Sequence, residues 1–298
     1  MREATGVLCM AYGSPSDDAD VEAYFTHIRG GRPPSQESLA ELRGRYRAVG
    51  GSPLTDITRA QAEALGRRLE MPVFVGMKHA RPFIADGAAE AAAAGVERLI
   101  GLPLAPHYAA MSVGAYHDAL QDAWQGPLVA VRGFHDHPAF IKAVGILLGE
   151  AMADFTPELT IFTAHSLPAR IEAEGDRYRD RLMESCRLVA DGVGLHEWEF
   201  AFQSASHTGE PWLGPDLLEA LGRRRVPRVL ICPIGFVADH LEVLYDIDVE
   251  AMRFARERGI VLRRTASFNA RLEFVDALAA VVRDAMRDEL PSAPIVNR

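Results

Sequence analysis

Short, β-rich apolar runs alternate with helical stretches along the whole chain, and this alternation constrains the fold more than any other feature. The apolar runs predict eight strands, near residues 6–12, 72–77, 97–104, 128–132, 158–164, 197–203, 227–234 and 260–266. Helical patterns fill most gaps, most clearly over 60–69, 83–94, 138–151 and 274–287. Such alternation is typical of parallel sheets covered by helices. The sequence therefore predicts an α/β fold with four strands in each half.

The two halves also match each other in detail. The first strands run into Ala11-Tyr12-Gly13-Ser14-Pro15 and Ala164-His165-Ser166-Leu167-Pro168. The third strands end in similar triplets (102–104 and 232–234), and after each fourth strand two Phe stand six residues apart (134 and 140, 268 and 274). These matches indicate a duplication, with two Rossmann-like lobes over 1–152 and 153–298. We expect the C-terminal helix, 272–288, to pack back on the first lobe.

The repeat predicts where a ligand would bind. Open parallel sheets bind ligands beyond the carboxyl ends of their strands. If the two sheets face each other, those ends meet in a cleft between the lobes. Tyr12 and His165 occupy equivalent positions, one in each lobe, so we expect them to face one another across this cleft.

Composition excludes several classes of protein. A net charge of −9 argues against a nucleic-acid partner, which would require a basic face. Three scattered cysteines with no C-x-x-C pair indicate neither a disulfide framework nor an iron–sulfur cluster. Neither a membrane-length apolar run nor a signal-peptide pattern is present. We therefore expect a cytoplasmic monomer without stable membrane insertion.

His165 and a line of carboxylates are the main candidates for chemistry. A histidine at a strand's carboxyl end is well placed as a base or metal ligand, although it could simply hydrogen-bond the turn. Glu242, Asp246 and Glu250 are spaced four apart and share one helical face, which a π-type turn would bring closer to alignment. Such a face is either solvated or occupied by a cation. Imidazole and carboxylates together suit iron, cobalt or zinc.

The segment 24–54 is rich in arginine. Arg29 and Arg45 lie in it, with Tyr46 and the turn that contains Ser52. Guanidinium groups bind carboxylates through paired hydrogen bonds, so the segment could grip an acidic ligand, or it could be an ordinary exposed helix. Tyr116 would add a flat hydrophobic wall, although an aromatic residue at this spacing is also typical of a core.

Several motifs together resemble the ferrochelatases. They are Met10-Ala11-Tyr12-Gly13-Ser14-Pro15, Thr26-His27-Ile28-Arg29-Gly30-Gly31-Arg32, Leu104-Ala105-Pro106-His107, Ala164-His165-Ser166-Leu167-Pro168, Pro211-Trp212-Leu213-Gly214-Pro215-Asp216, and the segment from Gly235 to Asp246, Gly-Phe-Val-Ala-Asp-His-Leu-Glu-Val-Leu-Tyr-Asp. The resemblance covers nearly the whole chain. Tyr12 in its Ala-Tyr-Gly context is similar to the coproporphyrin III ferrochelatases of Gram-positive-type bacteria.

The resemblance implies a role for each candidate residue. His165 and Glu242 would act in catalysis and bind the incoming iron, with Asp246 and Glu250 as further metal sites. Tyr12 would be the axial ligand to iron in the product. The tetrapyrrole would contact Arg29, Arg45, Tyr46, Ser52 and Tyr116. Gly30 stands where relatives often carry another basic residue.

The expected activity is insertion of Fe(II) into coproporphyrin III to form coproheme in haem biosynthesis, a lyase reaction with iron as substrate and no resident cofactor. His165, with an ordinary pKa of about 6.5, would accept a pyrrole proton near neutral pH. A transient contact with the downstream haem-pathway enzyme is expected. The alternatives are protoporphyrin IX as substrate, a cobalt or nickel chelatase for another tetrapyrrole, and a two-lobed haem- or solute-binding protein without catalysis.

Overall fold

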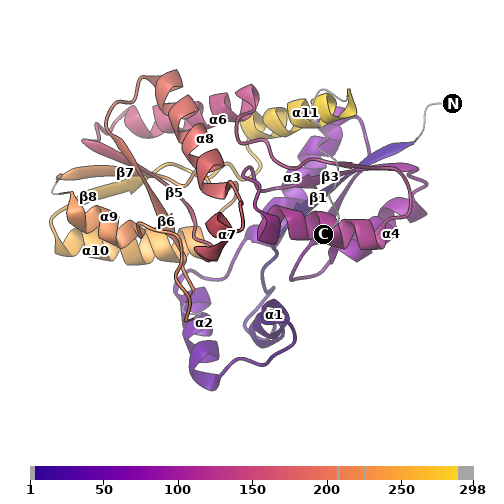
Figure 1. Ribbon diagram of the computed structural model, residues 1–298, viewed down its shortest axis with the longest axis horizontal. Coiled ribbons are helices and arrows are strands. Elements are labelled where there is room, and N and C mark those ends of the chain that lie inside the picture. The colour runs from indigo at the N-terminus through magenta and orange to yellow at the C-terminus, as the bar shows by residue number, and fades with distance from the viewer. Residues whose placement is uncertain (1–3, 207–208, 225, 288–298) are drawn as a thin grey trace.

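The computed structural model contains two four-stranded sheets in which all strands are parallel (Figure 1). It describes residues 4–206, 209–224 and 226–287. The strands are β1 (Thr5–Ala11), β2 (Val73–Met77), β3 (Arg98–Pro103), β4 (Leu128–Ala130), β5 (Leu159–His165), β6 (Trp198–Gln203), β7 (Arg228–Cys232) and β8 (Val261–Arg264). Their orders are β2-β1-β3-β4 and β6-β5-β7-β8, the same permutation twice. The predicted two-lobed α/β fold is confirmed.

The register of the strands makes the two turns equivalent. Leu102 on β3 pairs with Cys9 on β1, and Cys232 on β7 pairs with Phe162 on β5. Each of these β3 and β7 residues is followed by a proline, so Cys9 corresponds to Phe162. Counting three residues on from both brings Tyr12 onto His165. The tertiary structure therefore places the two side chains at the same point of their lobes.

Helices cover the sheets and connect the strands. They are α1 (Val21–Ile28), α2 (Gln36–Ala48), α3 (Leu54–Leu69), α4 (Ile84–Ala93), α5 (Ala115–Ala123), α6 (Pro138–Met152), α7 (Arg170–Ala173), α8 (Tyr178–Val193), α9 (Leu217–Arg223), α10 (Met252–Glu257) and α11 (Leu272–Met286), with π-helices η1 (Ala110–Gly114) and η2 (Glu242–Ala251). Helix α3 begins well before the predicted residue 60. Pro53 precedes it, at a position where a missing N–H costs little.

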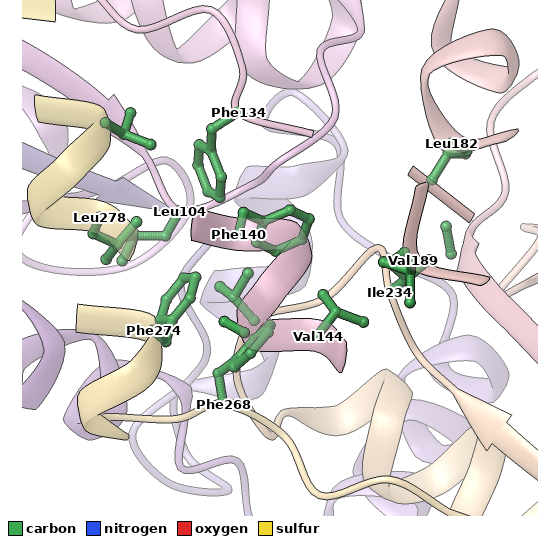
Figure 2. Close-up of a cluster of buried hydrophobic side chains, with 14 of the residues drawn as sticks. Leu104, Phe134, Phe140, Val144, Leu182, Val189, Ile234, Phe268, Phe274 and Leu278 are labelled. Atoms are coloured by element: carbon green, nitrogen blue, oxygen red, sulfur yellow. The ribbon is translucent and has the colours of Figure 1, made fainter. Parts of the chain in front are cut away.

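The four repeated phenylalanines meet in one cluster between the lobes (Figure 2). The ring centroids of Phe134 and Phe140 are 5.4 Å apart, and those of Phe268 and Phe274 are 4.7 Å apart. Across the repeat, Phe134 lies 6.5 Å from Phe274 and Phe140 lies 6.0 Å from Phe268. All four are at most 3% exposed. The duplicated elements therefore form a common core that joins the halves.

Each half ends in a helix that packs against the other half. Helix α6 packs against α8, and α11 packs against both α3 and α6. Residue 288, at the end of the predicted C-terminal helix, lies outside the described residues. The packing of these helices across the boundary, together with the shared aromatic core, gives the two lobes one continuous hydrophobic cluster.

Helices α1 and α2 project from the body of the molecule below the gap between the two sheets in Figure 1. They have a small hydrophobic cluster of their own, formed by Val21, Leu39 and Tyr46, with Leu241 packed against it. Ser35 caps α2 by accepting a hydrogen bond from the Ser38 N–H at 3.1 Å. The segment 24–54 is thus attached to the second lobe just before η2.

Within the described ranges, no helix is both long enough and apolar enough to cross a membrane.

Candidate active site

A cavity of about 560 Å³ lies between the carboxyl ends of the two sheets. Its wall includes Tyr12, Ser52 and Tyr116 from the first half and His165 and Glu242 from the second. The tertiary structure therefore brings five of the residues predicted from sequence to one cavity. Concave, largely apolar sites with a few convergent polar groups are typical of small-molecule binding.

A close approach of backbone brings His165 and Glu242 together. Gly235 follows β7 and its N–H donates to the Thr163 carbonyl oxygen at 3.0 Å. A Cβ at Gly235 would lie 2.4 Å from the Cβ of Ala164, so only glycine allows this contact. The loop that leads to Glu242 is consequently pressed against the end of β5, where His165 stands.

His165 presents one ring nitrogen to the carboxylate. Its Nδ1 hydrogen-bonds the Ser166 carbonyl oxygen, which can only accept, so Nδ1 carries a proton. Nε2 then lies 3.4 Å from Oε1 of Glu242. The Tyr178 hydroxyl donates to the His165 carbonyl oxygen at 3.1 Å and holds the backbone. Nε2 is therefore the ring nitrogen that faces the carboxylate.

Glu242 lies between two imidazoles. His240 Nδ1 hydrogen-bonds the Ala238 carbonyl oxygen at 2.9 Å, and its Nε2 lies 3.6 Å from Oε2 of Glu242. Gln203 donates to the Glu242 carbonyl oxygen at 2.9 Å. Sequence reasoning did not select His240 as a site residue; its spacing of two from Glu242 was the available signal.

His165 and Glu242 each stabilise the charged form of the other. Burial alone would lower the pKa of His165, but the charge of Glu242 and its hydrogen bond outweigh burial and raise this pKa to about 9. Burial acts to raise the pKa of Glu242, but the two neighbouring imidazoles hold it well below its usual range. An imidazolium therefore faces a carboxylate at neutral pH, and the pKa of His165 lies above the ordinary histidine value of about 6.5.

The other two carboxylates lie along η2, which is a π-helix throughout. Asp246 is buried; the Ser204 hydroxyl donates to its Oδ2, and Arg45 Nη1 lies 3.8 Å from its Oδ1. Burial and the charges of Glu242 and Glu250 raise the pKa of Asp246 to about 6. Among the described residues, neither Asp246 nor Glu250 is part of the cavity wall. They follow Glu242 away from the cavity.

In the described part of the chain, no group of three or more His, Cys, Asp or Glu side chains is arranged to hold a metal ion.

The wall of the first lobe carries Tyr12 with several basic neighbours. Tyr12 is 40% exposed, and its ring centroid lies 4.6 Å from that of His79. His79 Nδ1 is 3.0 Å from His27 Nδ1, and Lys78 Nζ lies 5.8 Å from the centre of the Tyr116 ring. Sequence reasoning did not select Lys78 or His79. Their position directly after β2, at the same sheet edge as Tyr12, was the usable signal.

The predicted gripping residues fall into different environments. Arg29 is exposed at the end of α1, with its guanidinium carbon 5.7 Å from the centre of the Phe25 ring. Arg45 pairs with Glu41 at 2.8 Å as well as with Asp246. Tyr46 is buried in the α1–α2 cluster. None of Arg29, Arg45 and Tyr46 is among the described residues that line the cavity.

Comparison with known proteins agrees with this geometry. The family model described as "Ferrochelatase" matches residues 4–286. A ferrochelatase of Herpetosiphon aurantiacus is 40% identical, with 95% of this chain and 99% of that protein covered. A coproporphyrin III ferrochelatase of Listeria innocua is also 40% identical, over 96% of this chain and 99% of that protein. Coproporphyrin III ferrochelatase 2 of Bacillus cereus is 38% identical over 99% of both.

Solved structures share the architecture. SirB from Bacillus subtilis, with Fe3+, superposes with a TM-score of 0.62 at 12% identity, covering 96% of both chains. CbiX superposes with a TM-score of 0.55 at 13% identity, covering 94% of this chain and 99% of that one. At such low identity these likenesses concern the fold alone.

Proposed function

The chain belongs to the ferrochelatase family, and we propose that it inserts Fe(II) into coproporphyrin III to form coproheme in haem biosynthesis. The observation that carries this proposal is the cavity itself, where His165 and Glu242 of one lobe face Tyr12 of the other. A flat macrocycle between these walls would meet a metal-binding pair on one side and a phenol on the other. Relatives named for coproporphyrin III support that substrate.

Substrate carboxylates would be held at the mouth of the cavity. Ser52 lines the cavity, while Arg29 and Arg45 stand on the helices beside it. Arginine binds carboxylates bidentately and keeps its charge at all relevant pH values. Tyr116 would pack on the macrocycle from the first lobe and Tyr46 would hold α2 in place. Binding of these remote groups can supply the roughly 1–5 kcal/mol needed to distort the ring.

The arriving iron would change the state of the histidine. His165 is protonated at neutral pH because the Glu242 carboxylate stabilises the imidazolium. A divalent cation that binds Glu242 cancels this negative charge, so the pKa of His165 falls and Nε2 loses its proton. The neutral imidazole can then bind the metal or accept a pyrrole proton. Iron binding and creation of the base are thus one event.

Insertion releases two pyrrole protons, which need a route to water. Asp246 lies one turn along η2 from Glu242, and its pKa of about 6 lets it exchange protons near neutral pH. Glu250 continues the same line. We assign these carboxylates to transfer of protons outward or of iron inward. Tyr12, on the opposite wall, would become the axial ligand of the inserted iron.

The protein would need no resident cofactor. Cys9, Cys186 and Cys232 lie on β1, α8 and β7 and are buried, and burial raises the pKa of each thiol. Protonated, buried thiols are poor ligands for an iron–sulfur cluster. We further propose that the chain acts as a cytoplasmic monomer, with no nucleic-acid partner, and passes its product to the downstream enzyme of the pathway by transient contact.

The test is anaerobic incubation with ferrous iron and coproporphyrin III, followed by the absorbance change of metal insertion. We expect faster turnover than with protoporphyrin IX, and loss of activity in His165→Ala. His196→Ala is the matched control, because His196 is exposed just before β6, at the amino end of that strand. Faster turnover of protoporphyrin IX, or a His165→Ala protein as active as His196→Ala, would contradict the proposal.

A further inference from the structure

The segment that carries Glu242 is attached at both flanks to one arginine. Asp239 lies three residues before Glu242, and Asp248 lies six residues after it within η2. Arg264, the last residue of β8, binds both of these carboxylates. The sequence motif included Asp239, but the proposed reaction assigns no role to Asp239, Asp248 or Arg264.

Arg264 makes a nearly complete set of hydrogen bonds. Its Nε lies 2.7 Å from Oδ1 of Asp248 and its Nη2 lies 2.8 Å from Oδ2, which is the two-pronged arrangement specific to arginine. Nη2 also lies 3.2 Å from Oδ1 of Asp239, and Nη1 donates to the Thr265 carbonyl oxygen at 3.0 Å. The side chain is only 15% exposed. Such a guanidinium fixes the orientation of the bound carboxylates as well as their distance from it.

Asp239 is held from the other side as well. The Ser267 hydroxyl donates to its Oδ1 at 2.7 Å, and Asn269 Nδ2 donates to its Oδ2 at 2.9 Å. The Asp239 N–H donates in return to Asn269 Oδ1 at 2.8 Å. Gln61 of the first lobe donates to the Asn269 carbonyl oxygen at 2.8 Å. The network therefore connects the segment before Glu242 to both lobes.

We propose that Arg264 is a positioning residue that sets the Glu242 carboxylate against Nε2 of His165. This inference rests on the proposed function, because it concerns how the same metal-binding pair is assembled. A π-helix is an irregular element that needs tertiary contacts to persist, and η2 begins at Glu242 itself. Because Asp239 and Asp248, on either side of Glu242, bind the same rigid guanidinium, rotation of Glu242 about the helix axis is restricted. Positioning errors of about 1 Å cost roughly 100-fold in rate.

The experiment compares Arg264→Lys with Arg263→Lys. Arg263 is the preceding residue of the same strand, is 46% exposed and pairs with Asp154 at 2.9 Å, so the chemical change is identical at a site remote from η2. Lysine keeps the positive charge but cannot make the paired hydrogen bonds of the planar guanidinium. For Arg264→Lys we expect kcat for iron insertion to fall about 10–100-fold, as for residues that orient metal ligands, with KM for coproporphyrin III within about twofold. Arg263→Lys should match the wild type.

A second readout does not depend on turnover. Co(II) titrated calorimetrically into the porphyrin-free protein should bind about tenfold more weakly to Arg264→Lys than to Arg263→Lys. If Arg264→Lys does not fold, as judged by circular dichroism, Asp248→Asn disrupts the same paired hydrogen bonds between Arg264 and Asp248. The same falls in kcat and in Co(II) affinity are then expected for Asp248→Asn. A folded variant with unchanged kcat and Co(II) affinity overturns the inference, as does an equal loss in both lysine variants. If the wild type inserts no iron, the proposed function fails, and the Co(II) titration still decides the role of Arg264.

Discussion

Asp246 is charged at neutral pH at a cost in stability, and Asp246→Asn should relieve that cost. Its pKa is about 6 in the folded protein against 3.8 for a free aspartate, and its side chain is only 10% exposed. A raised pKa means that the folded state disfavours the charged form. The penalty therefore appears as pH rises from the unfolded pKa through the folded one and is complete above about 6.

The difference between the folded and unfolded pKa values of Asp246 sets the magnitude of this stability penalty. The penalty amounts to about 3 kcal/mol at pH 7.5 and roughly half of that at pH 5. Asparagine cannot ionise, so Asp246→Asn should be more stable than the wild type by up to these amounts, with the larger gain at the higher pH. The same variant should insert iron more slowly, because the carboxylate line has lost its middle member. A charge kept at such a cost is typical of function.

Urea unfolding at pH 5 and pH 7.5, followed by tryptophan fluorescence, measures these free energies. Asp191→Asn is the control, because Asp191 is an exposed carboxylate on α8 and its replacement should change stability little at either pH. A gain that is the same at both pH values, or a variant less stable than the wild type at pH 7.5, would refute the electrostatic reasoning.

Three other substitutions give simpler outcomes. Phe274→Ala should destabilise the protein by about 3–5 kcal/mol in urea unfolding, since it opens the buried aromatic cluster, whereas Leu272→Ala, 66% exposed on the same helix, should cost little. Glu242→Gln should lower the pKa of His165 from about 9, because the charge and the hydrogen bond of Glu242 are lost while burial still disfavours the imidazolium; NMR titration of the imidazole measures this pKa, and an unchanged value would contradict the pairing. In the wild type the stabilisation contributed by protonated His165 is complete below about pH 6.5 and is lost as pH rises through about 9; the variant should lack that loss. Arg45→Gln should raise KM for coproporphyrin III several-fold, with protoporphyrin IX affected less, in steady-state assays.

The sequence by itself determined the strands, the duplication and the two residues that face each other. Parallel strands buried on both faces are continuous apolar runs, so each strand could be predicted within a few residues. The proline after the third strand of each half marks a fixed register position, and the matching turns after the first strands make Tyr12 and His165 equivalent. Local signals sufficed for these features because they concern neighbours along the chain.

Only the tertiary structure decided how the site is held and charged. Arg45 reaches Asp246, and Arg264 joins Asp239, which precedes η2, to Asp248 within η2; these contacts link elements distant in sequence. His240, in contrast, contacts Glu242 from only two residues away. The pKa of His165 also depends on the tertiary structure, because a buried imidazole is protonated or neutral according to the charge placed beside it, here that of Glu242. The spacing of the carboxylates predicted a shared helical face. That one of them would hold a proton on His165 required the 3.4 Å distance that folding creates.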